Sequence, residues 1–127
     1  MKVRIFYHHT DCGGVVYYAN YLKFLEEART EYLEQKGVFT KELSAKGTLF
    51  VVARQEIDYK SPAFYGDTLH IKTDLKEISG VKLIFENEIL NQENKVVAMA
   101  RTILVCIGKD FKPKAIPEEI RNKIIKQ

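Results

Sequence analysis

The segment from Tyr7 to Tyr18 reads YHHTDCGGVVYY and separates two sequence patterns of different period. Before it, apolar and polar residues alternate over Val3–Tyr7, which predicts a first strand. After it, from Tyr18 to about Lys36, apolar residues recur every three or four positions, which predicts an amphipathic helix. Gly13 and Gly14 allow backbone conformations that other residues disfavour, so a sharp turn is expected between the two elements.

The remainder of the chain is predicted to be largely β-structure. Four further strands are expected at Phe50–Tyr59, Leu69–Leu75, Val81–Ile89 and Val96–Ile107, the last of them apolar enough to be buried on both faces. Short helices are expected at Thr40–Ala45 and Glu118–Lys126. One long helix with five antiparallel strands is an α+β arrangement around a single core, so residues 1–127 are interpreted as one domain.

Composition argues against several functional classes. The 127 residues carry a formal charge of +3, with 20 basic and 17 acidic residues interspersed, which is too mild to predict nucleic-acid binding. No apolar run is long enough to cross a bilayer, and the N-terminus lacks the apolar core of a signal peptide. Cys12 and Cys106 show no secretory disulfide pattern, so a cytoplasmic protein with reduced thiols is expected.

Asp11 is the residue in the turn segment that is best suited to catalysis. A carboxylate near backbone N–H groups at a helix start is a plausible arrangement for acyl transfer, because such groups stabilise developing negative charge. An Asp in a Thr-Asp-x-Gly context is also a common turn former, whose side chain accepts backbone N–H groups. On the residues alone, the turn-forming role is the more common of the two.

The segment from Tyr7 to Tyr21, continued by FLEEARTE at 24–31, resembles the signature of the 4-hydroxybenzoyl-CoA thioesterase family, and most of all its YbgC branch, which is linked with the Tol-Pal system. IDYKSPA at 57–63, Gly66-Asp67, and the tail from Val105 to Pro117 resemble the same branch. The resemblance implies a hotdog fold, in which the sheet wraps the long helix and two subunits join edge to edge. By position, it implies Asp11 as the catalytic carboxylate and the backbone N–H of Tyr18 as the oxyanion donor.

The resemblance also implies a reaction, the hydrolysis of an acyl-CoA thioester to a carboxylic acid and free CoA. Asp11 either attacks the carbonyl or activates a water molecule, and the sequence leaves both routes open. No separate cofactor is expected, since CoA is part of the substrate. The chain departs from its branch at Tyr18, where His is common, and at His8 and His9, where acidic residues are common. Substrate preference therefore stays open.

Several assignments rest on weaker grounds. The residues expected to contact the substrate are Gly14, Tyr17, Tyr21, Val51 and Tyr59, and the candidates for the CoA phosphates are Lys60, Lys82 and Arg101. A Cys12–His9 nucleophile pair and catalysis by Glu26 or Glu27 are lesser alternatives. No metal site is expected, because His8 and His9 are adjacent and lack further ligands.

Two alternative functions and the assembly also remain open. The substrate could be an acyl-carrier protein, which bears the same thioester arm, or the protein could be a non-catalytic dimer that binds acyl thioesters. An open sheet edge favours pairing of two subunits, so a homodimer, or a tetramer of two dimers, is expected.

Overall fold

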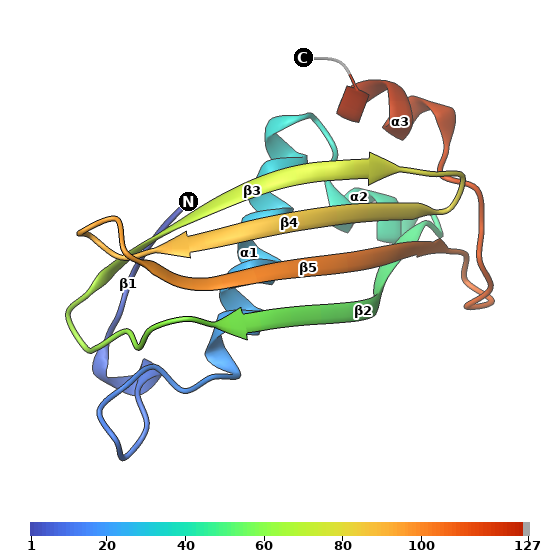
Figure 1. The fold of residues 1–127 in the computed structure, drawn as a ribbon. Helices are drawn as coiled ribbons and strands as arrows, with labels where there is room; N and C mark the ends of the chain where they lie inside the picture. The colour runs from blue at the N-terminus through green and yellow to red at the C-terminus, as the bar shows by residue number, and fades with distance from the viewer. Residues whose placement is uncertain (126–127) are drawn as a thin grey trace.

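The computed structural model describes residues 1–125 and contains one antiparallel sheet of five strands (Figure 1). Its strands are β1 (Lys2–Arg4), β2 (Leu49–Tyr59), β3 (Thr68–Ile78), β4 (Lys82–Leu90) and β5 (Val96–Ile107). The spatial order is β1-β3-β4-β5-β2, so the short β1 and the long β2 form the two edges. The helices are the 3₁₀ turn η1 (Tyr7–His9), α1 (Asn20–Gln35), α2 (Thr40–Ala45) and α3 (Glu118–Ile125). The predicted α+β arrangement is confirmed.

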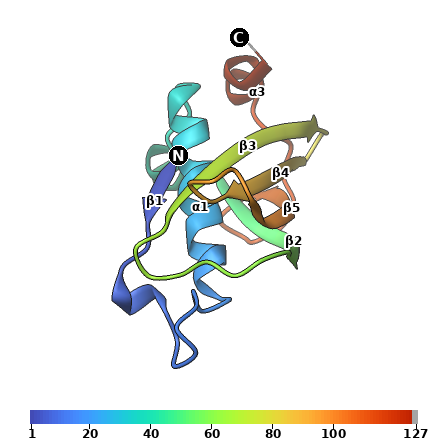
Figure 2. The ribbon, with the colours of Figure 1, turned by 60° about the vertical axis from the view of Figure 1, so that its left-hand side comes forward.

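The long helix α1 lies against the concave face of the sheet, which curls around it (Figure 2). Period-3.6 spacing places its apolar side chains on one stripe, and period-2 alternation turns every second strand residue towards them. One cluster of buried residues joins the first half of α1 to the sheet and includes Tyr21, Phe24, Leu25, Leu69, Ile71 and Ile89. A second cluster joins Leu33 at the end of α1 to Phe85, Leu104 and three isoleucines at the C-terminal end, Ile116, Ile120 and Ile124. This is the hotdog arrangement.

Helix α1 ends one residue before the predicted Lys36, and Gly37 sets this end. Gly37 has φ of +83°, in the left-handed region that favours glycine. Its N–H donates to Glu34 C=O at 2.9 Å, and Val38 N–H donates to Leu33 C=O at 2.8 Å. Together with Lys36 N–H, which donates to Leu33 C=O at 3.0 Å, these two bonds satisfy the last carbonyls of the helix.

Two predicted boundaries beside the turn segment are wrong, as is one prediction of burial, and β3 runs three residues beyond its predicted end at Leu75. The first strand ends at Arg4 and not at Tyr7, because the chain turns into η1. The long helix begins at Asn20 and not at Tyr18. Strand β5 is not buried on both faces, since Met99 on its outer face is 45% exposed. For the closing helix, the structure gives Glu118–Ile125, and the predicted last residue, Lys126, lies outside the described residues.

The edge strand β2 is long, exposed and apolar in part. In the described chain it pairs only with β5, and a bulge at Ala53 shifts its register between Val52 and Arg54. Val51 and Val52 are 39% and 51% exposed. A long edge with exposed β-branched side chains can pair with another strand unless something covers it.

Candidate active site

A short hairpin between β1 and α1 carries Asp11 at its tip. Tyr17 N–H donates to His9 C=O at 2.9 Å, and Asp11 N–H donates to Val15 C=O at 2.9 Å. Gly14 N–H donates to Asp11 C=O at 3.0 Å, which closes a four-residue turn. The backbone of Asp11 is thereby held from both sides, while its side chain points into solvent.

The carboxylate of Asp11 is partly engaged in this turn. Its Oδ1 accepts the N–H of Gly13 at 2.8 Å, which is the turn-forming bond expected for an Asp in this context. Among the described residues, no hydrogen bond is made by Oδ2. Gly14 has φ of +80°, and a Cβ at Gly13 would lie 3.1 Å from Oδ1. Both glycines therefore serve the turn, one through its backbone conformation and the other through the space it leaves for the carboxylate.

The backbone N–H of Tyr18 lies beyond the hairpin, in the turn before α1. Val16 N–H donates to Ala63 C=O at 2.8 Å and fixes this part of the chain to the segment after β2. The Oη of Tyr59 donates to Tyr18 C=O at 3.3 Å. Within residues 1–125, no protein acceptor is bonded to Tyr18 N–H. The oxyanion donor implied by the family resemblance thus lies two residues before Asn20, where α1 begins, and has no acceptor among the described residues.

Tyrosines surround this turn. The ring centroids of Tyr18 and Tyr59 are 6.4 Å apart, those of Tyr21 and Tyr59 are 5.6 Å apart, and those of Tyr17 and Tyr18 are 4.8 Å apart. Burial raises the pKa of Tyr21 to about 12, so this phenol stays neutral at physiological pH. The end of the molecule that holds Asp11 therefore offers aromatic surface and phenolic hydroxyl groups.

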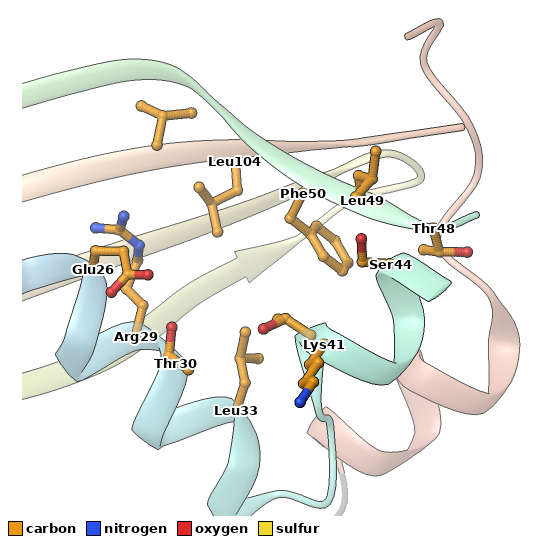
Figure 3. Close-up of a pocket in the computed structure, with 12 residues that line it drawn as sticks. Glu26, Arg29, Thr30, Leu33, Lys41, Ser44, Thr48, Leu49, Phe50 and Leu104 are labelled. Atoms are coloured by element: carbon orange, nitrogen blue, oxygen red, sulfur yellow. The ribbon is translucent and has the colours of Figure 1, made fainter. Parts of the chain in front are cut away.

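A groove with a volume of about 410 Å³ runs between α1, α2 and β2 (Figure 3). Apolar side chains line its middle, and they include Leu33, Phe50 and Leu104. The groove lies at the end of β2 that begins with Leu49, whereas the hairpin lies at the end that finishes with Tyr59. In one chain, the carboxylate and the groove are thus at opposite ends of the same edge strand.

Arg29 is the most unusual residue of the groove. Only 7% of it is exposed, and burial lowers the pKa of its guanidinium. Its Nη1 donates to Thr102 Oγ1 at a long 3.4 Å, and no carboxylate of the described residues lies within salt-bridge distance. Glu26 is one turn earlier on α1 and stabilises the charge at longer range. A buried cation with so few partners is costly unless something else compensates it.

The structure separates the residues predicted to contact substrate. Gly14, Tyr17 and Tyr59 lie around the Asp11 turn with Tyr18. Tyr21 packs in the core and is 3% exposed, while Val51 lies towards the far end of β2. Of the phosphate candidates, Lys60 follows β2 near the turn. Lys82 starts β4 at the opposite end of the sheet, and Arg101 lies 4.0 Å from Glu86.

Two site residues are missing from the sequence interpretation. Arg29 has a detectable signal, because it falls four residues after Leu25 and four before Leu33, on the apolar stripe of α1. Asn20 donates from its side-chain amide to His9 C=O at 2.8 Å, a long-range contact that no local pattern reveals. Within residues 1–125, no cluster of three His, Cys, Asp or Glu side chains is placed to hold a metal ion, and no helix is long and apolar enough to span a membrane.

Comparisons with known proteins agree with this architecture. The sequence profile of the thioesterase-like superfamily matches residues 7–124. The acyl-CoA thioester hydrolase YbgC of Escherichia coli is 39% identical over 119 residues, covering 93% of this chain and 89% of that protein. The acyl-CoA thioesterase YbgC of Haemophilus influenzae is 38% identical, covering 94% and 88%.

A solved structure extends the agreement to the fold. The 1,4-dihydroxy-2-naphthoyl-CoA thioesterase of Synechocystis superposes with a TM-score of 0.91 at 24% identity, covering 99% of this chain and 94% of that one. At that identity the likeness concerns the fold alone. Together with the profile match and the two relatives, it leads to one conclusion: the chain belongs to the thioesterase-like superfamily, in its branch of YbgC-type acyl-CoA thioesterases.

Proposed function

We propose that this protein hydrolyses an acyl-CoA thioester and that Asp11 is the carboxylate that does so. The observation that carries the proposal is that one short segment holds both an exposed carboxylate, with one oxygen free of hydrogen bonds among the described residues, and a backbone N–H at Tyr18 that is unbonded among them. A nucleophile or base and an oxyanion donor are the two groups that acyl transfer requires. The names of the E. coli and H. influenzae relatives support an acyl-CoA substrate.

The reaction can follow two routes with these groups. In the first, Asp11 Oδ2 attacks the thioester carbonyl, the C–S bond breaks, CoA leaves as its thiolate, and water hydrolyses the resulting anhydride. In the second, the carboxylate removes a proton from water, which attacks the same carbon, and that proton ends on the departing thiolate. In both, the Tyr18 N–H would donate to the oxyanion, an interaction that typically contributes about 3 kcal/mol to lowering the barrier.

The acyl group needs a pocket, and the proposed homodimer supplies one. If two β2 edges pair antiparallel about a two-fold axis near the middle of the strand, the Tyr59 end of one strand lies beside the Leu49 end of the other. The Asp11 turn of one subunit then approaches the 410 Å³ groove of its partner. Pairing would also cover the exposed Val51 and Val52.

Residues 1–127 would thus act as one hotdog domain per subunit, with two composite sites per dimer. A tetramer of two such dimers is compatible with this arrangement. We place the enzyme in a reducing compartment such as the cytoplasm, since Cys12 and Cys106 are both free and Cys12 is exposed.

The direct test is CoA release from a panel of short, long and aromatic acyl-CoAs by wild type and Asp11→Asn. Cys12→Ser is the matched control, because Cys12 is the exposed neighbour of Asp11 in the same turn. We expect hydrolysis by wild type and Cys12→Ser, and loss of at least about 100-fold in kcat for a folded Asp11→Asn.

Other results would redirect the assignment. An active Asp11→Asn would remove Asp11 from the mechanism, and an inactive Cys12→Ser would move the nucleophile to the thiol. No CoA release by wild type from any acyl-CoA would refute the proposed substrate, and acyl-carrier-protein thioesters and simple binding would then be measured instead.

A further inference from the structure

His9 occupies a junction between three elements beside the Asp11 turn. The backbone N–H of His9 donates to Phe6 C=O at 3.0 Å, and the backbone N–H of Phe6 donates to the imidazole Nδ1 of His9 at 2.9 Å. These reciprocal bonds close η1. The ring also packs edge-on against Phe24 of α1, with centroids 5.3 Å apart. A single side chain therefore ties the end of the β1 segment to the long helix.

The carbonyl of His9 holds the other side of the site. It accepts Tyr17 N–H at 2.9 Å and the side-chain amide of Asn20 at 2.8 Å. Tyr17 immediately precedes Tyr18, and Asn20 is the first residue of α1. The orientation of the Tyr18 N–H and the base of the Asp11 hairpin both depend on where the His9 backbone lies.

We propose that His9 is a positioning residue for the Asp11–Tyr18 site, and that the site keeps its geometry only while the His9 imidazole is neutral. The activity part of this inference rests on the proposed function; the conformational part does not. Because Nδ1 accepts a hydrogen bond from Phe6, the neutral ring carries its proton on Nε2. Protonation of Nδ1 would place its N–H against the N–H of Phe6. The hydrogen bond from Phe6 N–H to Nδ1, one of the two that close η1, would then be lost.

The surroundings of His9 also favour its neutral form. Burial is the largest cause of a lowered His9 pKa, and the adjacent His8, whose ring centroid is 4.0 Å away, lowers it further. On α1, Glu27 raises this pKa and Lys23 lowers it. Arg4 of β1 lies on the other side of Phe6, with its guanidinium 5.3 Å from the centroid of that ring. Since the folded-state pKa is lowered, this contribution to stability is complete above about pH 6.5 and is lost as the pH falls through the folded pKa.

The test compares three variants over pH 5 to 8. In His9→Asn, the Oδ1 of Asn is bonded to Cγ, as Nδ1 is in His, and can accept the same hydrogen bond. The Asn side chain does not titrate in this range. His9→Ala removes the acceptor, and His8→Asn is the control, since His8 is its exposed neighbour. The kcat is measured on the best acyl-CoA of the panel, and the Phe6 and Tyr17 amides are followed by NMR.

The expected results separate positioning from simple loss of structure. Wild type and His8→Asn should lose kcat at acid pH with a midpoint below about 6.5, while His9→Asn should retain it. His9→Ala should lose about 10-fold or more at every pH, since misplacement of reacting groups by an ångström costs up to about 100-fold. The Phe6 amide resonance of wild type should shift with the same midpoint, and Tyr17 amide protection should fall in His9→Ala.

Two outcomes would overturn the inference. One is an acid limb that persists unchanged in His9→Asn, and the other is a Phe6 amide that does not titrate with His9. If wild type releases no CoA, the proposed substrate fails, yet the Phe6 and Tyr17 amides still decide whether the His9 imidazole controls the turn.

Discussion

Alanine substitution at the adjacent residues Gly13 and Gly14 should affect different properties, namely kcat for Gly13→Ala and thermal stability for Gly14→Ala. Gly14 has φ of +80°, and a Cβ added there would meet no other described atom within 4 Å, so the cost of Gly14→Ala lies in the backbone alone. An L-residue in the left-handed region costs about 1 to 2 kcal/mol. For a chain of this size, that lowers Tm by roughly 3 to 9 °C. Activity measured well below Tm should change little.

Gly13→Ala affects the carboxylate and not the backbone. A Cβ at this position would lie 3.1 Å from Asp11 Oδ1, so the carboxylate must move by a few tenths of an ångström. Asp11 is exposed and has room to move, so the stability cost should stay below about 1 kcal/mol. Because a shift of an ångström can cost up to about 100-fold, this smaller shift should lower kcat by roughly 3- to 10-fold.

The assay is thermal unfolding together with kcat on the best acyl-CoA substrate. Gly14→Asn serves as the control, since Asn tolerates the left-handed region better than Ala and should recover part of the lost stability. The reasoning is refuted if Gly13→Ala loses as much stability as Gly14→Ala while its kcat equals that of wild type.

Two further predictions concern buried polar groups. Thr102→Val keeps the shape of a fully buried side chain but removes the hydroxyl that accepts from Arg29 and donates to Gln55 Oε1 at 2.9 Å. It should cost about 1 to 3 kcal/mol in urea unfolding, and a cost near zero would mean that water or a partner subunit replaces the hydroxyl. Because the folded-state pKa of Tyr21 is about 12 and its unfolded value is near 10, its contribution to stability is complete below pH 10 and is lost between pH 10 and 12. Between pH 10 and 12, the free energy of unfolding of Tyr21→Phe should fall by up to about 2 to 3 kcal/mol less than that of wild type. If the two free energies of unfolding change in parallel with pH, the prediction is wrong.

The regular elements could be predicted from the sequence where one local pattern dominates. Strand β5 at Val96–Ile107 and helix α2 at Thr40–Ala45 have the predicted bounds, because the apolar run of β5 and Gly47 after α2 are local signals. The end of the first strand could not be predicted in this way. The reciprocal hydrogen bonds of Phe6 and His9 form η1 where the alternation of apolar and polar residues predicts a strand. Helix α1 starts later than predicted because residues 18 and 19 form a turn. Apolar residues keep helical spacing through this turn, so the pattern does not separate it from the helix.

The candidate site was predictable only in part for the same reason. Asp11 is separated from Gly13 and Gly14 by Cys12 alone, so their proximity is certain from the chain itself. The bond from Tyr59 to the Tyr18 carbonyl spans 41 residues, and that from Arg29 to Thr102 spans 73. Such contacts follow from strand order, which periodicity does not specify. Val51 illustrates the difference: it has the right chemistry for a pocket but lies at the wrong end of β2 in a single subunit.

The strand order β1-β3-β4-β5-β2 has a consequence for how this chain is made. Leu49 of β2 pairs with Ile107 of β5, so β2 cannot complete its pairing until a residue 58 positions later has been synthesised. At 5 to 20 residues per second, that delay is about 3 to 12 s on the ribosome. During this interval α1 and β2 have left the ribosome ahead of the strand that completes their core, while β3 and β4 can form a hairpin as soon as they emerge. Nascent chains halted before residue 96 should therefore bind chaperones, whereas released chains of all 127 residues, which also supply Ile116, Ile120 and Ile124 to the second cluster, should not.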